Sequence, residues 1–281
     1  VKRGSGVVTI TFEDYKVYVD APTRTNPTAL SVARLDLAGA SVGDYALFAG
    51  GNTGSVSAVV DAYNTNLTRS TPTTLSVARQ ELIGASVGDY ALFAGGHTGS
   101  KFSDVVDAYY KDLTHSTPTV LSVARGVPAA ASVGNYALIA GGFATDGSAV
   151  VDAYDTDLTR STPTVLSAAR YALAGASVGN YALFAGGYTT TYSAVVDAYD
   201  TDLTRSTPTV LSAARAWLTG ASVGNYALFA GGQNSPTNNL TMVDAYDTGL
   251  TRSTPTVLSA KRAWLAGASI ADYAIFAGGV I

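Results

Sequence analysis

The sequence of 281 residues has no cysteine and only two histidines, two tryptophans and one methionine. Without cysteine it can hold neither a disulfide framework nor a thiolate site. No apolar run approaches the ~20 residues of a membrane-spanning helix, so we expect no membrane insertion. The net charge is −4 with no basic run, which argues against a nucleic-acid partner. His97 and His115 are expected on opposite faces of the fold derived below, so we predict no metal, no cofactor and no catalytic triad.

Hydrophobic residues make up 47% of the chain and charged residues 14%, which favours a large core over disorder. The opening "VKRGSGVVTI" has neither an initiator methionine nor a long apolar signal core. We therefore expect a mature or excised chain, such as one cut from a longer protein.

One motif returns six times along the chain. "ASVGNYALFAGG" occupies 176–187 and 221–232, and near copies lie at 40–51, 85–96, 131–142 and 268–279. Successive glycine pairs are 45, 46, 45, 45 and 47 residues apart, and a series of arginines has the same spacings. The arginines are Arg34, Arg79, Arg125, Arg170, Arg215 and Arg262. A fixed period in this range predicts a solenoid or a propeller.

The copy at 170–211 shows what one repeat builds. A short strand of small residues, "YALAGASV", ends in the turn "GN" and is followed by the apolar run "YALFAGG". After a loop come "AVVDAYD" and then "LTRSTPTVLS", which is rich in Thr and Ser and contains proline. Each run has strand length, Gly-Asn is a tight hairpin signal, and helical periodicity is missing. One copy therefore predicts four antiparallel strands.

The strand compositions indicate how the sheets are arranged. Small residues suit a crowded axis, a continuous apolar strand suits a position between neighbouring sheets, and a strand with proline suits an exposed edge. The sequence thus predicts an all-β fold, a six-bladed β-propeller in a single domain, 1–281. Residues 263–281 supply only two inner strands. We expect 1–30 to complete that blade and close the ring.

The chain resembles the kelch repeat family in three features of every copy. These are the double glycine that ends the second strand, the Tyr of "VDAYD" and the "AR" before the next repeat. Many kelch repeats carry Trp in the fourth strand, where this chain has leucines. The leucines are Leu67, Leu113, Leu158, Leu203 and Leu250. The likeness to bacterial and phage kelch-like arrays implies an extracellular, cell-surface or virion-associated setting rather than the cytoplasm, without fixing one.

The copies differ mainly on one face. The turns "VGDY" or "VGNY" and the connections such as "DTDLTRSTP" are nearly uniform and share one face of the disc. The loops after the glycine pairs and the residues after the repeated arginines vary, and they share the other face. Loops on a rigid framework are the usual place for recognition, so we predict a binding surface there.

The six arginines have two interpretations. They could form a positive collar that accepts a carboxylate or an acidic peptide, as arginines near this corner do in some kelch adaptors. Alternatively, each arginine could bind carbonyls of its own or a neighbouring blade, which would explain its presence in every copy. We expect the recurring third-strand aspartates to have a structural partner, such as the Arg of "LTRS".

The variable face offers further candidate ligand contacts. Trp217 and Trp264, with Tyr171, could form a platform for a sugar ring or side chain, or could instead plug the channel mouth. Asp36 and Glu81 stand in matching positions of neighbouring blades and could instead be ordinary solvated or Arg-paired acids. The first residues of three loops complete the candidate set. They are His97, Phe143 and Tyr188.

Three functions remain in competition. The first is a non-catalytic module that binds a protein, peptide or glycan through the variable face. The second is a structural propeller within a larger surface or virion assembly. The third is an enzyme, because kelch-like propellers include copper oxidases and sugar mutarotases. The oxidases need a cysteine, which this sequence does not have. In a mutarotase-like reaction Glu81 could act as the acid or base.

Overall fold

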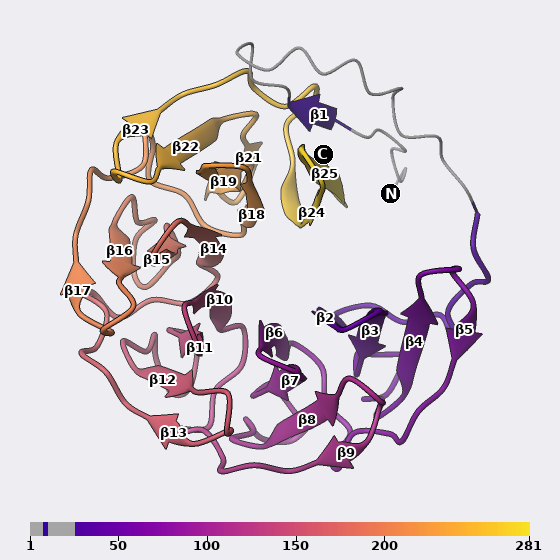
Figure 1. The fold of residues 1–281 in the computed structure, drawn as a ribbon. Helices are drawn as coiled ribbons and strands as arrows, with labels where there is room; N and C mark the ends of the chain where they lie inside the picture. The colour runs from indigo at the N-terminus through magenta and orange to yellow at the C-terminus, as the bar shows by residue number, and fades with distance from the viewer. Residues whose placement is uncertain (1–7, 11–25) are drawn as a thin grey trace.

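The computed structural model describes residues 8–10 and 26–281, and no helix occurs in these residues. Five four-stranded antiparallel sheets follow one another along this part of the chain. In Figure 1 the sheets stand side by side around a common centre, with the first strand of each sheet innermost and the fourth outermost. The prediction of an all-β fold with four antiparallel strands per repeat is confirmed, and the arrangement is propeller-like.

The sheets have the same strand order throughout. The first contains β2 (Ala38–Val42), β3 (Tyr45–Ala49), β4 (Val60–Asn64) and β5 (Arg69–Ser70). The second contains β6 (Ile83–Val87), β7 (Tyr90–Ala94), β8 (Val106–Tyr110) and β9 (His115–Ser116). The third contains β10 (Ala129–Val133), β11 (Tyr136–Ala140), β12 (Val151–Tyr154) and β13 (Arg160–Ser161). The fourth contains β14 (Ala174–Val178), β15 (Tyr181–Ala185), β16 (Val196–Tyr199) and β17 (Arg205–Ser206). The fifth contains β18 (Thr219–Val223), β19 (Tyr226–Ala230), β22 (Val243–Asp247) and β23 (Arg252–Ser253), with a small hairpin of β20 (Gln233–Ser235) and β21 (Asn238–Asn239) in its loop.

A three-stranded sheet brings the two ends of the chain together. It has the order β1 (Val8–Ile10), β25 (Tyr273–Val280) and β24 (Ala263–Ile270). Val8 lies opposite Phe276 and Ile10 opposite Ala274. Within the segment expected to complete this sheet, 1–7 and 11–25 lie outside the described residues.

The inner strands pack closely where glycine occupies their second position, and the third sheet has Ala130 at this position instead. A Cβ on Gly175 would lie 2.1 Å from the carbonyl oxygen of Ala130 in the neighbouring inner strand, and Gly220 meets Gly175 in the same way. Serines then join these strands, because Ser132 and Ser177 each donate a hydroxyl to the preceding strand at 2.6 Å. Small residues at the axis therefore have the role that the sequence predicted.

The core lies between neighbouring sheets. One cluster joins Leu138 and Val151 of the third sheet to Phe184 and Tyr199 of the fourth, all at most 1% exposed. Leu203 packs against this cluster from the turn before β17, so this leucine fills space between blades. The apolar second strands β7, β11, β15 and β19 are thus covered on both faces, as predicted, whereas β3 and β25 are partly exposed.

The fourth strands are shorter than the sequence suggests. Each contains two residues, for example Arg205–Ser206, and pairing ends before the Thr-Pro that follows. The physical reason is that proline cannot donate to a ladder, and the threonines around it are exposed. A two-residue outer strand also offers little edge for unwanted pairing.

Five of the six glycine pairs join one sheet to the next. In the first pair, Gly50 has φ of 69°, and a Cβ there would lie 2.6 Å from the carbonyl oxygen of Arg79 in the next repeat. The same oxygen accepts the N–H of Gly51 at 2.9 Å. Positive φ and close approach both require glycine at this position, which explains the recurrence of the pair.

Candidate ligand-binding site

The repeated arginines are buried within the sheets. Five of them form ion pairs of 2.6–2.8 Å with the third-strand aspartates, and their side chains are at most 1% exposed. The pairs are Arg34–Asp61, Arg79–Asp107, Arg125–Asp152, Arg170–Asp197 and Arg215–Asp244. Arg262 is also buried and donates to the carbonyl oxygen of Gly278 at 2.7 Å.

A second basic side chain reaches each aspartate from the fourth strand. Arg205 approaches Asp197 to 2.9 Å, and His115 takes the arginine's place beside Asp107 at 2.7 Å. Burial lowers the pKa of Arg170, while the nearby Asp197 opposes that shift. The guanidinium groups therefore bind partners inside the sheets, which agrees with the second of the two interpretations given above. Five of the six pair with an aspartate and are not exposed in a positive collar for an acidic ligand.

The second residue after each arginine has a left-handed backbone. At these six positions φ lies between 51° and 56°, although none of them is glycine. They are Asp36, Glu81, Val127, Ala172, Trp217 and Trp264, which we call the display ring. Residues other than glycine are disfavoured in this region, and positions held there often lie at functional sites. The repeated leucines before the fourth strands also have a left-handed backbone. They differ from the display ring, because a leucine such as Leu203 packs against the core.

Backbone hydrogen bonds connect members of the display ring. The N–H of Glu81 donates to Asp36 O, and that of Val127 donates to Glu81 O, both at 3.0 Å. On the other side, the N–H of Trp264 donates to Trp217 O at 3.0 Å. Four of the five successive pairs are thus joined by one backbone hydrogen bond, so the display ring borders the common centre of the sheets, and we call this region the mouth.

The variable loops lie beside this mouth. The first residue after each arginine pairs with the first residue after a glycine pair, as in the bridges Gln80↔His97 and Tyr171↔Tyr188. The predicted grouping of these two kinds of variable segment on one face is confirmed for the described repeats.

A continuous series of aromatic rings runs across this face, and we call it the aromatic arc. Successive ring centroids are 5.0–6.3 Å apart, a range typical of aromatic contacts. The members are His97, Phe102, Phe143, Tyr171, Tyr188, Tyr192, Trp217 and Trp264. Trp264 ends the arc with 52% of its surface exposed. The structure therefore brings together every aromatic residue proposed for the site.

Sequence reasoning missed two members of the arc. Phe102 and Tyr192 lie four or five residues after His97 and Tyr188 in the same loops, and each forms an isolated bridge back to them. A signal was present: a second aromatic residue in a loop that already begins with an aromatic ring.

The acidic side chains lie at the opposite end of the arc. A Cβ at Gly126 would meet both the Phe102 ring, at 3.2 Å, and Glu81 Oε2, at 3.6 Å, so ring and carboxylate lie against the same backbone. Burial, followed by the charge of Asp36, raises the pKa of Glu81, and His97 opposes this. Burial also raises the pKa of Asp36. In the described part of the chain neither acid forms an ion pair.

One buried amide borders the aromatic arc. Gln233 is 4% exposed, and its Nε2 donates to the Tyr192 hydroxyl at 3.1 Å. Its Oε1 has no hydrogen-bond partner. A buried acceptor without a partner requires an explanation, and a donor from a ligand would provide one.

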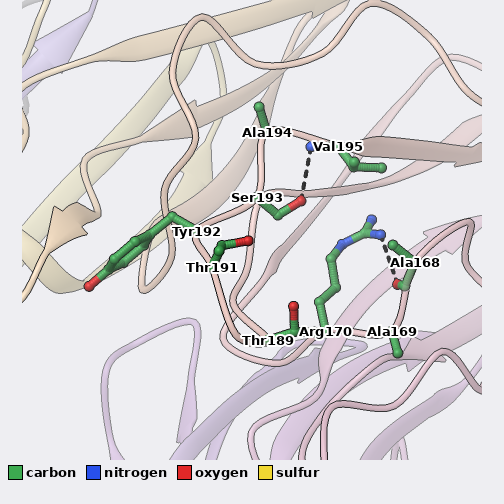
Figure 2. Close-up of a pocket in the computed structure, with 9 residues that line it drawn as sticks. All are labelled: Ala168, Ala169, Arg170, Thr189, Thr191, Tyr192, Ser193, Ala194 and Val195. Atoms are coloured by element: carbon green, nitrogen blue, oxygen red, sulfur yellow. Dashed lines mark hydrogen bonds between the residues drawn. The ribbon is translucent and has the colours of Figure 1, made fainter.

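A pocket of about 280 Å³ adjoins the arc between the linker at 168–170 and the loop residues 189–195. Figure 2 shows Thr189 and Thr191 beside Arg170, with the Tyr192 ring pointing away from them. Arg170 donates to Ala168 O at 3.1 Å and pairs with Asp197, so its charge is already satisfied. The pocket therefore offers threonine hydroxyls rather than a free cation.

The described residues contain no group of three His, Cys, Asp or Glu able to hold a metal ion. Nor do they contain a helix long and apolar enough to cross a membrane.

The repeated sheets and the mouth at their centre define a propeller-like, all-β protein. Among solved structures, 441 chains match it, and one of these is the structure of YjhT. That likeness has a TM-score of 0.66 and 13% sequence identity, and it covers 79% of this chain and 84% of that chain. At this identity it concerns the fold alone. No protein-family model and no curated protein matches the sequence.

Proposed function

We propose that the chain is a six-bladed, kelch-like propeller that acts as a non-catalytic binding module for a protein, peptide or glycan. The sixth blade is the sheet of β24, β25 and β1. Its register supports this assignment, because Val8 faces Phe276 just as Asp244 of a complete sheet faces Phe229. In this proposal β1 is the third strand of the sixth blade, which takes strands from both ends of the chain.

The observation that carries the binding function is the aromatic arc. Aromatic side chains supply much of the energy at binding surfaces, and here eight rings lie in one series across the variable face. Trp217 and Trp264 also occupy left-handed backbone positions, where a bulky residue is costly unless it serves a purpose. If only the backbone conformation mattered at these positions, glycine would satisfy it without strain.

The test is a glycan and peptide array probed with the native protein and with the double variant Trp217→Ala, Trp264→Ala. Binding that the double variant loses supports recognition at the mouth. The control is Tyr110→Ala, because Tyr110 packs on Tyr90 on the uniform face and should leave binding unchanged. Equal binding by both variants would place recognition elsewhere, and no binding by the native protein would favour a structural role in a larger assembly.

A sugar mutarotase-like reaction is the second candidate, and the observation that favours it is the half-buried carboxyl group of Glu81. Its raised pKa suits an acid or base better than an ordinary glutamate. NMR exchange between anomers of a reducing sugar would detect this activity. Exchange at the native rate in Glu81→Gln would exclude Glu81 from the reaction.

A further inference from the structure

Among the described residues that differ between repeats, one buried side-chain atom has no hydrogen-bond partner, and it is an acceptor. This atom is Gln233 Oε1, which lies beside Tyr192. At the other end of the aromatic arc, the carboxylates of Asp36 and Glu81 have no ion pair within the described residues. An acceptor-rich site is complementary to a ligand that supplies donors.

The cations that could neutralise these acids are already engaged. Five repeated arginines pair with buried aspartates, and the sixth donates to a backbone carbonyl. The variable loops between the glycine pairs and the third strands contain one further cation, Lys101, which is exposed. An acidic ligand would therefore meet two carboxylates and few available positive charges.

The display ring is chemically asymmetric. Asp36 and Glu81 form an acidic side, and Trp217 and Trp264 form an aromatic side whose ring centroids are 5.3 Å apart. Between them lie Val127 and Ala172, and the small Ala172 is 4% exposed.

We infer that this mouth binds a basic side chain, arginine above all, presented by a peptide or protein. The inference rests on the proposed binding function and specifies its ligand. A guanidinium group carries only donors, is planar and stacks on aromatic rings, so it suits the acidic side, where the Phe102 ring and Glu81 Oε2 lie against the same backbone at Gly126. Its donors also pair well with carboxylates. A neutral glycan could stack on the tryptophans but would leave both carboxylates uncompensated.

Calorimetric titration with two short peptides tests the inference. The probe is acetyl-Gly-Arg-Gly-amide, and the matched peptide replaces arginine by citrulline, which has nearly the same shape without the charge. We expect the citrulline peptide to bind about tenfold more weakly or worse, since bonds to charged groups are the stronger ones. Glu81→Gln should weaken binding of the arginine peptide by a similar factor. Chitotriose serves as the uncharged glycan probe.

Two variants control for charge elsewhere. Asp202→Asn removes an exposed carboxylate on the uniform face and should leave affinity unchanged. Lys101→Ala should leave affinity unchanged or raise it. Loss of binding in Lys101→Ala would instead indicate an acidic ligand and overturn the inference.

The outcomes separate this inference from the proposed function. Equal binding of the citrulline peptide or chitotriose, with no effect of Glu81→Gln, rejects the basic ligand but leaves a binding module. So does an arginine peptide that fails to bind while the array finds another ligand lost in the double tryptophan variant. Failure of every probe and of the whole array rejects both.

Discussion

Each third-strand aspartate holds two basic side chains, and Asp197 shows how much that arrangement should stabilise a blade. Its carboxylate is fully buried, 2.7 Å from Arg170 and 2.9 Å from Arg205, and it accepts the N–H of Ser167 at 3.0 Å. Asp197→Asn keeps the shape but removes the charge, leaving Arg170, which is 1% exposed, as a buried cation without a counter-ion. Removing one partner of a buried pair costs about 3–5 kcal/mol. Arg205 adds little, because water reaches it.

Equilibrium urea denaturation followed by far-ultraviolet circular dichroism measures this loss. The control Asp202→Asn lies on the exposed turn between β16 and β17 and should change the unfolding free energy by less than about 0.5 kcal/mol. The double variant Arg170→Met, Asp197→Leu should recover part of the lost stability, since apolar pairs often replace buried ion pairs without cost, whereas the N–H of Ser167 loses its acceptor. A loss below about 1 kcal/mol in Asp197→Asn would refute the reasoning, because Arg170 would then not depend on the carboxylate.

Two further predictions concern the axis and the acidic side of the mouth. Gly175→Ala would place a Cβ 2.1 Å from the carbonyl oxygen of Ala130 in the neighbouring inner strand. It should therefore destabilise the fold by about 1–3 kcal/mol, measured by thermal unfolding. The control Gly249→Ala makes no contact below 3.4 Å and should keep the native stability. Affinity for a cationic ligand should fall as the pH drops from about 7 towards about 5, because burial and Asp36 raise the pKa of Glu81 and a protonated Glu81 carries no charge. Fluorescence titrations should show a weaker pH dependence in Glu81→Gln, and an unchanged profile would contradict the assignment.

The strand order and the place of each strand could be predicted from the sequence, because each composition pattern has one physical cause. The glycine pairs, the small first strands and the apolar second strands each occupy the place that their composition requires. The fourth strand was overestimated, since threonine and serine suit both an edge strand and an extended linker. Only the proline marks where pairing ends.

The site was harder to read, because one residue type can satisfy two demands. A recurring arginine fits a ligand collar as well as an internal ion pair, and the choice depends on where Asp197 and its equivalents point. The left-handed positions were not visible at all, since Val127 and Trp217 are residues that ordinarily avoid that conformation. The aromatic residues were easier to place, because the period itself put Trp217 and Trp264 in register.

The buried arginine and aspartate pair also affects how such a chain can change. It fixes the backbone two residues before the display position, whatever side chain stands there, as Ala172 and Trp217 in adjacent repeats show. A repeat copied by gene duplication would therefore already contain the ion pair that fixes its backbone. Its display position could then change without disturbing that backbone. Five such positions, each after a paired arginine, could therefore be altered one at a time without changing the sheet that carries them.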